Sequence, residues 1–209
     1  MGLEKIDHRT YASILSSDGK IRVQCNEGDE GSVKREYETS DGKTGVKFEQ
    51  VYDKLTGKIK SIEFKEGEYG KQIIVDIDGT ALAMGTSNNF GEDFMKKLPN
   101  IVLEDLVELS PFAFTNDKGK SVKGISIRQG DEKVPNFFWD IEASKSCNGY
   151  PVPEGDTRKF DADDWKMYFM VARKFLIKYI EDNILPKMAL ESLPPMAGET
   201  EITTEDIPQ

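Results

Sequence analysis

The sequence predicts a mainly β protein with added helices, on the basis of three observations. Short segments in which apolar and polar residues alternate, separated by turns rich in Gly, Asp and Asn, occupy much of residues 11–142. Only two segments have helical periodicity, one short and one long. These helices do not alternate with the strands, so a parallel sheet built from β-α-β units is not expected. The 209 residues suffice for one ordinary domain with a tail, or at most for two small domains.

Two hairpins are expected at the start of the chain. The segments YASIL and KIRVQC flank the turn SSDG, which predicts a hairpin within residues 1–33. After the polar break NEGDEGS, the segments VKREYE and VKFEQVY flank the turn SDGKTG and predict a second hairpin.

The central strands are expected in the segments KIKSIEF, KQIIVDI and TALAMG. Ile73, Val75 and Ile77 recur at every second position, as on the buried face of a strand. Asp78-Gly79 then predicts a tight hairpin turn, with Asp76 pointing to solvent. Later, LVELSPFAF and KGISIRQG predict two strands joined by the polar turn TNDKGKS, and VPNFFWDIE predicts one more.

The short helix is expected in NNFGEDFMKKLPN, between the central strands and the later pair. Phe90, Phe94 and Leu98 recur there at four-residue steps, and Pro99 ends the pattern.

The long helix is expected over residues 161–185, packed on the sheet by one apolar stripe. Asp161 or Asp163 is suited to cap its start, and Pro186 is expected to end it. The stripe consists of Trp165, Phe169, Ala172, Leu176 and Ile180.

Residues 186–209 are expected to form a disordered acidic tail, because they combine prolines and acids with no aromatic residue. The net charge is −10, and the five acids from residue 190 onward account for half of it. Residues 34–133 are nearly balanced, with 16 basic and 18 acidic side chains. The acidic total therefore does not exclude a nucleic-acid partner.

The expected location is cytoplasmic. The first residues lack the apolar core of a secretory signal, and no window approaches the length of a membrane span. Cys25 and Cys147 are far apart and form no metal or redox motif, which favours a reducing compartment. We expect neither a cofactor nor a bound metal.

The run VDIDGT resembles the nucleophile motif of haloacid-dehalogenase-type phosphatases. That resemblance implies attack on phosphorus by Asp76, acid–base work by Asp78 and a bound Mg²⁺. The phosphatases need a parallel, doubly wound sheet, whereas the neighbouring segments here are expected strands and turns. The hairpin interpretation is therefore favoured, and the phosphatase remains an alternative.

The segment GKIKSIEFKEGEYGKQIIVDIDGTALAMG is similar to the first three strands of an OB fold. FGEDFMKKLPNI then occupies the place of the helix, and DLVELSPFAF and VKGISIRQG the places of strands four and five. This layout implies an elaborated five-stranded OB barrel. On this view residues 1–185 form one nucleic-acid-binding domain, with 1–33 as a hairpin extension and 161–185 as an added helix.

Together with the tail, the chain resembles the single-stranded DNA-binding proteins of bacteriophages and, more distantly, those of bacteria. In the bacterial proteins a run of acids precedes Ile-Pro-Phe at the tip, which recruits replication and repair proteins. Here Glu205, Asp206, Ile207 and Pro208 match, whereas Gln209 replaces the Phe. The resemblance implies a non-enzymatic protein of DNA replication or recombination that binds single-stranded DNA without sequence preference, inside the host cell.

In such sites Lys and Arg follow the phosphates while aromatic rings stack on the bases. The candidate DNA-binding residues are Lys58, Lys60, Phe64, Lys65, Tyr69, Lys71, Phe112, Lys118, Lys120, Lys123, Arg128 and Trp139. Phe114 is a further candidate ring, and Lys34, Arg35, Tyr37, Lys43 and Lys47 form a second basic group upstream.

The alternative for Phe64, Phe112 and Phe114 is packing in the core, whereas Tyr69 lies between glycines in an expected loop. A second alternative function is a protein-interaction module that binds its partner through the tail or the helix of Trp165. The sequence leaves open the choice between DNA and RNA, and the oligomeric state.

Overall fold

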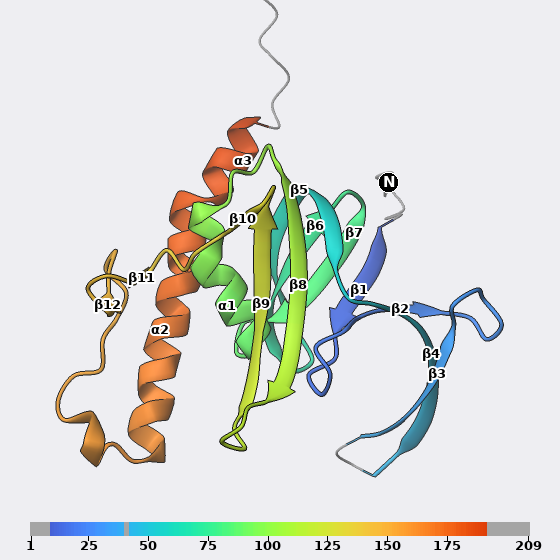
Figure 1. Ribbon diagram of the computed structural model, residues 1–209, viewed down its shortest axis with the longest axis horizontal. Coiled ribbons are helices and arrows are strands. Elements are labelled where there is room, and N and C mark those ends of the chain that lie inside the picture. The colour runs from blue at the N-terminus through green and yellow to red at the C-terminus, as the bar shows by residue number, and fades with distance from the viewer. Residues whose placement is uncertain (1–8, 40–41, 192–209) are drawn as a thin grey trace, which may run out of the picture.

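The computed structural model describes residues 9–39 and 42–191, and a curved ten-stranded sheet is its main feature (Figure 1). The strands of this sheet are β1 (Thr10–Ile14), β2 (Ile21–Cys25), β3 (Val33–Glu38), β4 (Thr44–Tyr52), β5 (Leu55–Gly67), β6 (Gly70–Ile77), β7 (Thr80–Gly85), β8 (Leu106–Thr115), β9 (Ser121–Gln129) and β10 (Glu132–Lys133). A separate pair of strands is formed by β11 (Trp139–Asp140) and β12 (Lys145–Ser146). The helices are α1 (Asn89–Lys97), α2 (Ala162–Asn183) and α3 (Leu185–Glu191), with 3-10 turns η1 (Leu98–Asn100) and η2 (Thr157–Lys159).

The order of strands across the sheet is β10-β9-β8-β5-β6-β7-β1-β2-β4-β3. Neighbouring strands are antiparallel, except that β1 and β7 are parallel. The nine strands expected between residues 10 and 129 are all present, and the two N-terminal hairpins pair as expected. The mainly β class with a long C-terminal helix is thus confirmed.

The turn between β6 and β7 confirms the hairpin interpretation of VDIDGT. Asp78 and Gly79 have φ angles of 45° and 88°, the positive values that a two-residue type I′ turn requires. The prediction that Asp76 points to solvent is wrong. Asp76 is buried; its Oδ1 accepts the Gly79 N–H at 2.9 Å, which holds the turn, and the Arg9 Nε lies 3.9 Å from its Oδ2.

The five-stranded OB barrel is also a wrong prediction, because the sheet is large and open. β5 does pair with both β6 and β8, as in an OB fold. β7, however, pairs with β1, and the sheet continues through β2 and β4 to β3. No backbone pairing joins β7 to β9 within the described residues, so the sheet does not close into a barrel.

Helix α1 covers the edge of β9 that such a pairing would have used. The Asp93 Oδ2 accepts the Ile125 N–H at 2.9 Å, and the Lys97 Nζ donates to the Ile125 carbonyl. Asp93 and Lys97 are one helical turn apart and also form an ion pair at 2.9 Å. The side chains of Asp93 and Lys97 therefore make the two backbone hydrogen bonds of Ile125 that a neighbouring strand would otherwise make.

The turn between β1 and β2 packs against the far end of β8. Gly19 has a φ of 68°, and a side chain there would lie 2.5 Å from the Ala113 nitrogen. The Lys123 Nζ on β9 donates to Ser16 Oγ at 2.9 Å. A glycine is required at this close approach, which joins the N-terminal hairpin to the later strands.

The core lies on the inner face of the sheet, under α1 and α2. Its buried side chains include Ile73, Val75, Ile77, Leu82, Phe90, Phe94, Leu109, Ile125, Phe138, Leu176 and Ile180. Asp161 caps α2 and forms a capping box with Asp164, as the acids at this position indicated. The long helix stops before Pro186, at Asn183, two residues earlier than predicted, and Pro186 lies in the first turn of α3, where no intrahelical N–H bond is lost.

The predicted strand VPNFFWDIE is largely wrong, since only Trp139 and Asp140 pair as a strand. The Phe138 ring instead lies edge-on to Phe175 and Tyr179 of α2, at 5.5 and 5.1 Å between ring centres. The apolar residues of this segment therefore pack on helix α2 and do not mark a strand.

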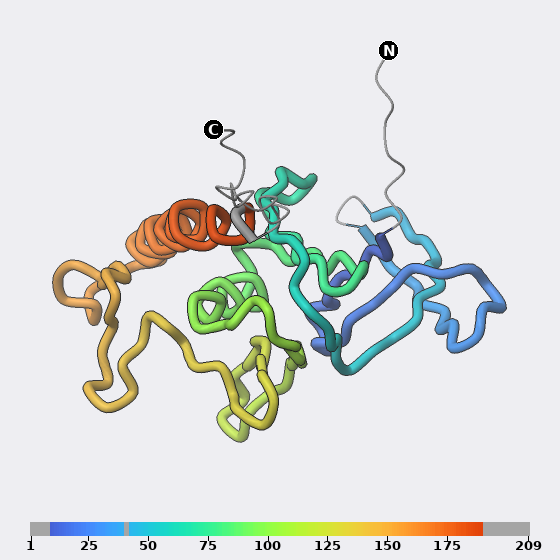
Figure 2. Tube along the Cα trace, turned by 90° about the horizontal axis from the view of Figure 1, so that it is seen from above, coloured from blue at the N-terminus to red at the C-terminus, as the bar shows by residue number. Residues whose placement is uncertain are grey.

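Seen from above, α2 and the β3–β4 hairpin lie at opposite ends of the molecule (Figure 2). Within the described part of the chain, no helix combines the length and the apolar character needed to cross a membrane.

Candidate nucleic-acid interface

Five of the twelve candidate DNA-binding residues lie on the outward side of β5, β8 and β9 or in the β8–β9 turn: Lys58, Phe112, Lys118, Lys120 and Arg128. Pairing with β9 and β5 defines this side, because partners in register share one face. We call it the β8 face; it consists of Leu106, Glu108, Ser110, Phe112 and Phe114 on β8, Val122, Gly124, Ser126 and Arg128 on β9, and Thr56 and Lys58 on β5.

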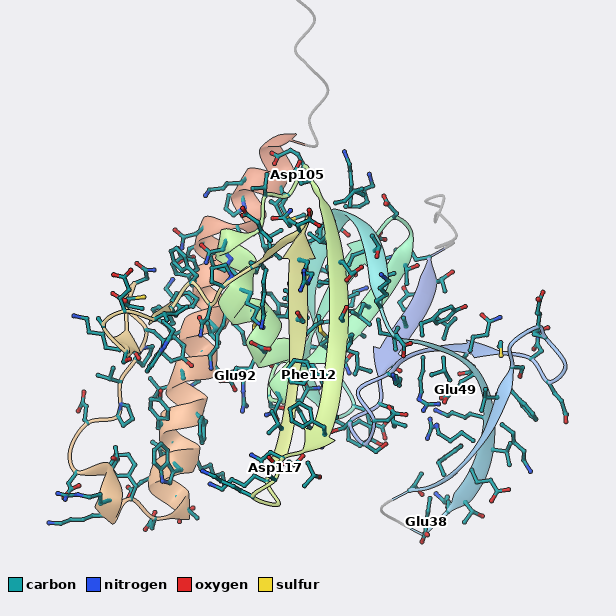
Figure 3. All side chains as sticks on the ribbon, viewed as in Figure 1. Glu38, Glu49, Glu92, Asp105, Phe112 and Asp117 are labelled. Carbon is teal, nitrogen blue, oxygen red and sulfur yellow. The ribbon has the colours of Figure 1, made fainter. Side chains whose placement is uncertain are left out.

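Two phenylalanines form the aromatic part of the β8 face. The rings of Phe112 and Phe114 are 5.9 Å apart, and 55% of Phe114 is exposed. Gly124 lies opposite Phe112, where a Cβ atom would come within 2.8 Å of the ring. Figure 3 shows Phe112 near the lower end of β8, above the turn that contains Asp117. Phe112 is half-buried and Phe114 is exposed, and neither ring packs in the core, which was the alternative for both.

Two exposed lysines follow in the β8–β9 turn. The Asn116 Oδ1 accepts the backbone N–H groups of Lys118 and Lys120, at 3.0 and 2.9 Å, and so shapes the turn. Neither lysine, nor Lys58 on β5, forms an ion pair with any residue in the described ranges. Their charges are therefore available to a bound phosphate.

The other end of the β8 face combines cations with acids, because Glu104 and Asp105 line the same groove as Lys58. Lys54, which sequence reasoning did not single out, pairs with Glu108 at 2.6 Å; its hydrogen bond lowers the pKa of that carboxyl. Arg128, opposite Glu108, donates to the Asp131 carbonyl at 3.3 Å. Lys54 lies in the turn before β5, where the sequence has no periodic pattern. Only the pairing of β5 with β8 shows that this lysine lies next to Glu108.

Three predicted residues surround the β5–β6 turn, away from the β8 face. Lys65 is seven residues beyond Lys58 along β5, roughly 23 Å at the rise of a strand. It pairs with Glu63 at 3.0 Å, and Lys71 pairs with Glu181 of α2 at 3.3 Å. Tyr69 is 82% exposed at the tip of the turn, as expected of a loop residue.

The remaining predicted residues have other surroundings. Lys60 lies at a β-bulge and pairs with Asp78 at 3.3 Å. Phe64 faces the core, with the Lys71 Nζ 5.2 Å from its ring centre. Trp139 is 45% exposed on the separate strand β11, and Lys123 points to the inner side of β9.

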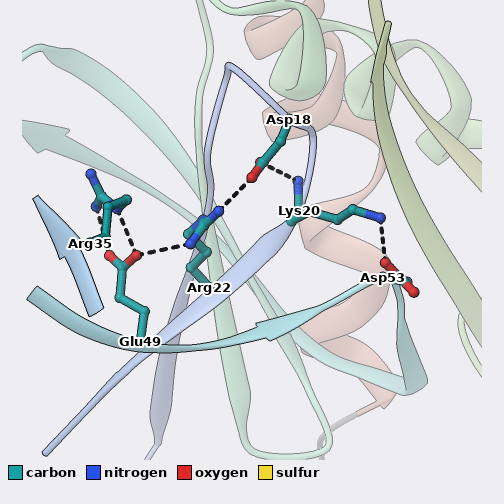
Figure 4. A network of polar contacts seen from close by, with 6 residues as sticks. All are labelled: Asp18, Lys20, Arg22, Arg35, Glu49 and Asp53. Atoms are coloured by element: carbon teal, nitrogen blue, oxygen red, sulfur yellow. Dashed lines mark hydrogen bonds and ion pairs between the residues drawn. The ribbon is translucent and has the colours of Figure 1, made fainter. Parts of the chain in front are cut away.

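In the upstream basic group, Arg35 on β3 binds Glu49 on β4 and so links the two strands of the hairpin (Figure 4). Its guanidinium donates two hydrogen bonds of 2.7 Å to Glu49, and Arg22 approaches the same carboxylate at 3.3 Å. These bonds lower the pKa of Glu49 and raise that of Arg35. Arg22 also pairs with Asp18. We call Asp18, Arg22, Arg35 and Glu49 the hairpin network.

The other members of that basic group lie on the same hairpin. Lys34 pairs with Glu36 at 3.2 Å, and the Lys47 Nζ is 5.1 Å from the Tyr37 ring centre. The Lys43 backbone N–H donates to the Thr39 hydroxyl at 3.1 Å.

The two aspartates of the phosphatase alternative hold backbone groups. Asp76 binds the Gly79 N–H, and the Asp78 Oδ2 accepts the Lys58 N–H at 2.9 Å, which lowers the Asp78 pKa. No cluster of three or more His, Cys, Asp or Glu side chains suited to a metal occurs in residues 9–39 and 42–191. The predicted partner-binding residues Glu205, Asp206, Ile207 and Pro208 lie outside the described residues.

Comparison with known proteins found no matching family model, no matching curated protein and no matching solved structure.

Proposed function

We propose that this protein binds single-stranded DNA along the β8 face without reading its sequence. The observation that carries the proposal is the position of Phe112 and Phe114 beside Lys118 and Lys120, whose charges no described residue neutralises. Rings that stack on bases and cations that follow phosphates are the two components of such binding.

The chemistry of the face accounts for the absence of sequence preference. A ring stacks on any base, and a lysine contacts a phosphate that is the same at every position. From Leu106 to Phe114 the outward side of β8 extends over ~27 Å at the rise of a strand. The rings occupy one end of this length, while Lys58 and Arg128 lie toward the other.

The proposal includes an OB-type unit made of β5, β6, β7, α1, β8 and β9, opened by the insertion of β1 beside β7. In OB folds the face of strands two and three and the loops between strands one–two and four–five bind single strands. The β8–β9 turn takes the place of the four–five loop, whereas the rest of the β8 face belongs to strands one, four and five. The proposed role is in bacteriophage DNA replication or recombination, by binding and not by catalysis. Glu205, Asp206, Ile207 and Pro208 would recruit replication or repair proteins.

Fluorescence anisotropy of a labelled oligo-dT strand with the full chain tests this function. We expect binding at low salt that weakens as salt is added, with a slope of log K against log salt of about −0.7 for each phosphate contacted. Duplex DNA of the same length is expected to compete poorly, because its bases are not free to stack. No binding of oligo-dT at low salt would exclude the proposal.

A further inference from the structure

A polar cavity of about 550 Å³ lies between one side of α1, the start of β9 and the first half of α2. Lys96 of α1, Lys123 of β9 and Arg173 of α2 bring three positive charges to its wall, and Glu92 and Asp93 bring two negative ones. Figure 3 shows Glu92 on the side of α1 that is next to α2.

Both acids of the cavity already have partners. Glu92 forms an ion pair with Lys96, and its hydrogen bond and charge raise the Lys96 pKa although burial alone would lower it. Asp93 pairs with Lys97 and accepts the Ile125 N–H. Neither carboxylate therefore neutralises the remaining cations.

Lys123 and Arg173 are those remaining cations. The Lys123 Nζ donates to the Ser16 hydroxyl, which is uncharged. Arg173 forms no ion pair with any residue in the described ranges, and its Nε is buried without a hydrogen-bond partner. Buried N–H groups are nearly always hydrogen bonded, and a guanidinium cannot lose its charge, so this donor requires an explanation.

We propose that the cavity binds a phosphate-type oxyanion, with Arg173 and Lys123 as its ligands. An oxyanion in the cavity would neutralise the two unpaired charges at once. The planar donor groups of arginine match the oxygen atoms of a phosphate, and lysine adds a second point charge.

The surroundings favour a phosphate that belongs to a nucleotide. Phe169 lines the same cavity and is 46% exposed, with its ring stacked at 5.8 Å on Trp165. Lys123 is three residues beyond Lys120, and Figure 1 places the β8–β9 turn at the same end of the molecule as the first half of α2. A strand that leaves the β8 face past this turn reaches the cavity.

The oxyanion site does not depend on the proposed DNA binding; only the assignment of the phosphate to a DNA strand rests on it. The same chemistry would accept a free phosphate compound. Separate titrations with inorganic phosphate and with oligo-dT distinguish the two sources.

The Arg173 Nε–H signal in a ¹⁵N-resolved NMR spectrum of the full chain reports directly on the site. We expect it to shift in a saturable manner with inorganic phosphate and with oligo-dT, but not with sodium chloride at equal ionic strength. Arg173→Gln and Lys123→Gln should each weaken phosphate binding about tenfold, the loss of one charge-assisted hydrogen bond. Lys174→Gln, the same charge change at the next, exposed position of α2, should leave it unchanged.

An unshifted Arg173 signal with both ligands would overturn the inference, as would equal losses in Lys174→Gln and Arg173→Gln. If Arg173→Gln and Lys123→Gln weaken the binding of inorganic phosphate but leave the binding of oligo-dT unchanged, the ligand of the site is a free phosphate compound. If the wild type binds phosphate through Arg173 but does not bind oligo-dT, the site stands and the proposed DNA binding fails. If Arg173→Gln does not fold, Lys123→Gln and the wild-type signal still decide the question.

Discussion

The hairpin network and the β8 face both contain arginines or lysines on one face of the sheet, yet they use these charges differently. In the hairpin network Arg22 and Arg35 converge on Glu49, whose side chain is 8% exposed. On the β8 face and in its turn, Lys58, Lys118 and Lys120 have no ion pair within the described residues. The number of cations in a segment therefore does not distinguish charges that have a structural partner from charges that remain available to a ligand; the contacts of each side chain do.

The hairpin network lies where the β3–β4 hairpin is attached to the rest of the sheet. The β3–β4 hairpin joins the rest of the sheet through β2, and Glu49 pairs in register with Gln24 on one side and Val33 on the other. Its carboxylate thus lies where both strand pairs overlap. Arg22 on β2 and Arg35 on β3 connect through it, which fixes the hairpin to the sheet.

The largest expected effect comes from removing the shared carboxylate. Glu49→Gln leaves Arg22, 10% exposed, and Arg35 without their common counter-charge, and should lower the free energy of unfolding by about 3 kcal/mol. Urea unfolding monitored by circular dichroism measures this. Glu36→Gln, an exposed position on β3 whose partner Lys34 is also exposed, is the matched control and should change stability by less than about 0.5 kcal/mol. Equal losses in the two variants would contradict the role of Glu49.

The next effect concerns binding. Phe114→Ala should weaken oligo-dT binding by about 1–3 kcal/mol, the contribution of one stacked base, with little change in stability because the ring is exposed. Anisotropy titrations at fixed salt measure it. Trp139→Ala is the control, since this exposed ring lies on β11, outside the β8 face. A larger loss for Trp139→Ala than for Phe114→Ala would move the binding path away from β8.

These two regions also indicate what the sequence could and could not predict. Local patterns identified the strands from β1 to β9, the Asp78-Gly79 turn and both main helices, because alternation and turn residues depend on neighbours in the chain. The open sheet depends on long-range pairing of β7 with β1, and on the Asp93 and Lys97 contacts at the β9 edge. No local sequence pattern predicts the pairing of β7 with β1 or the contacts of Asp93 and Lys97.

The candidate site was predictable to a similar degree. In LVELSPFAF both alternating sets contain apolar residues, so the pattern alone does not say whether Phe112 and Phe114 point inward; the register places Pro111 and Ala113 on the inner side. The type of a residue also does not reveal its partner. Arg35 and Lys118 were both predicted as cations for DNA, and only the folded chain places Glu49 beside the first.

A smaller effect is expected from the turn lysines. Replacing Lys118 and Lys120 together by Gln should reduce the slope of log K against log salt by roughly 1.4, since each phosphate contact contributes about 0.7 for a single strand. Anisotropy titrations across a salt series measure the slope. Lys145 and Lys159, exposed and outside the β8 face, provide a control with the same loss of charge. Equal slopes for the two double variants would mean that only net charge matters.

The smallest effect concerns the protonation of Glu49. Because its two arginines lower its pKa in the folded protein, its contribution to stability is complete above the unfolded pKa of about 4.3 and is lost as the pH falls through the lower folded value. Protonation keeps the oxygen atoms in place, so the loss should be smaller than in the substitution. Urea unfolding of the wild type and Glu49→Gln between pH 6 and pH 3, a range of about three units around that pKa, measures the difference. We expect this difference to shrink toward acid; a constant difference would mean that the negative charge of Glu49 contributes nothing to holding the hairpin.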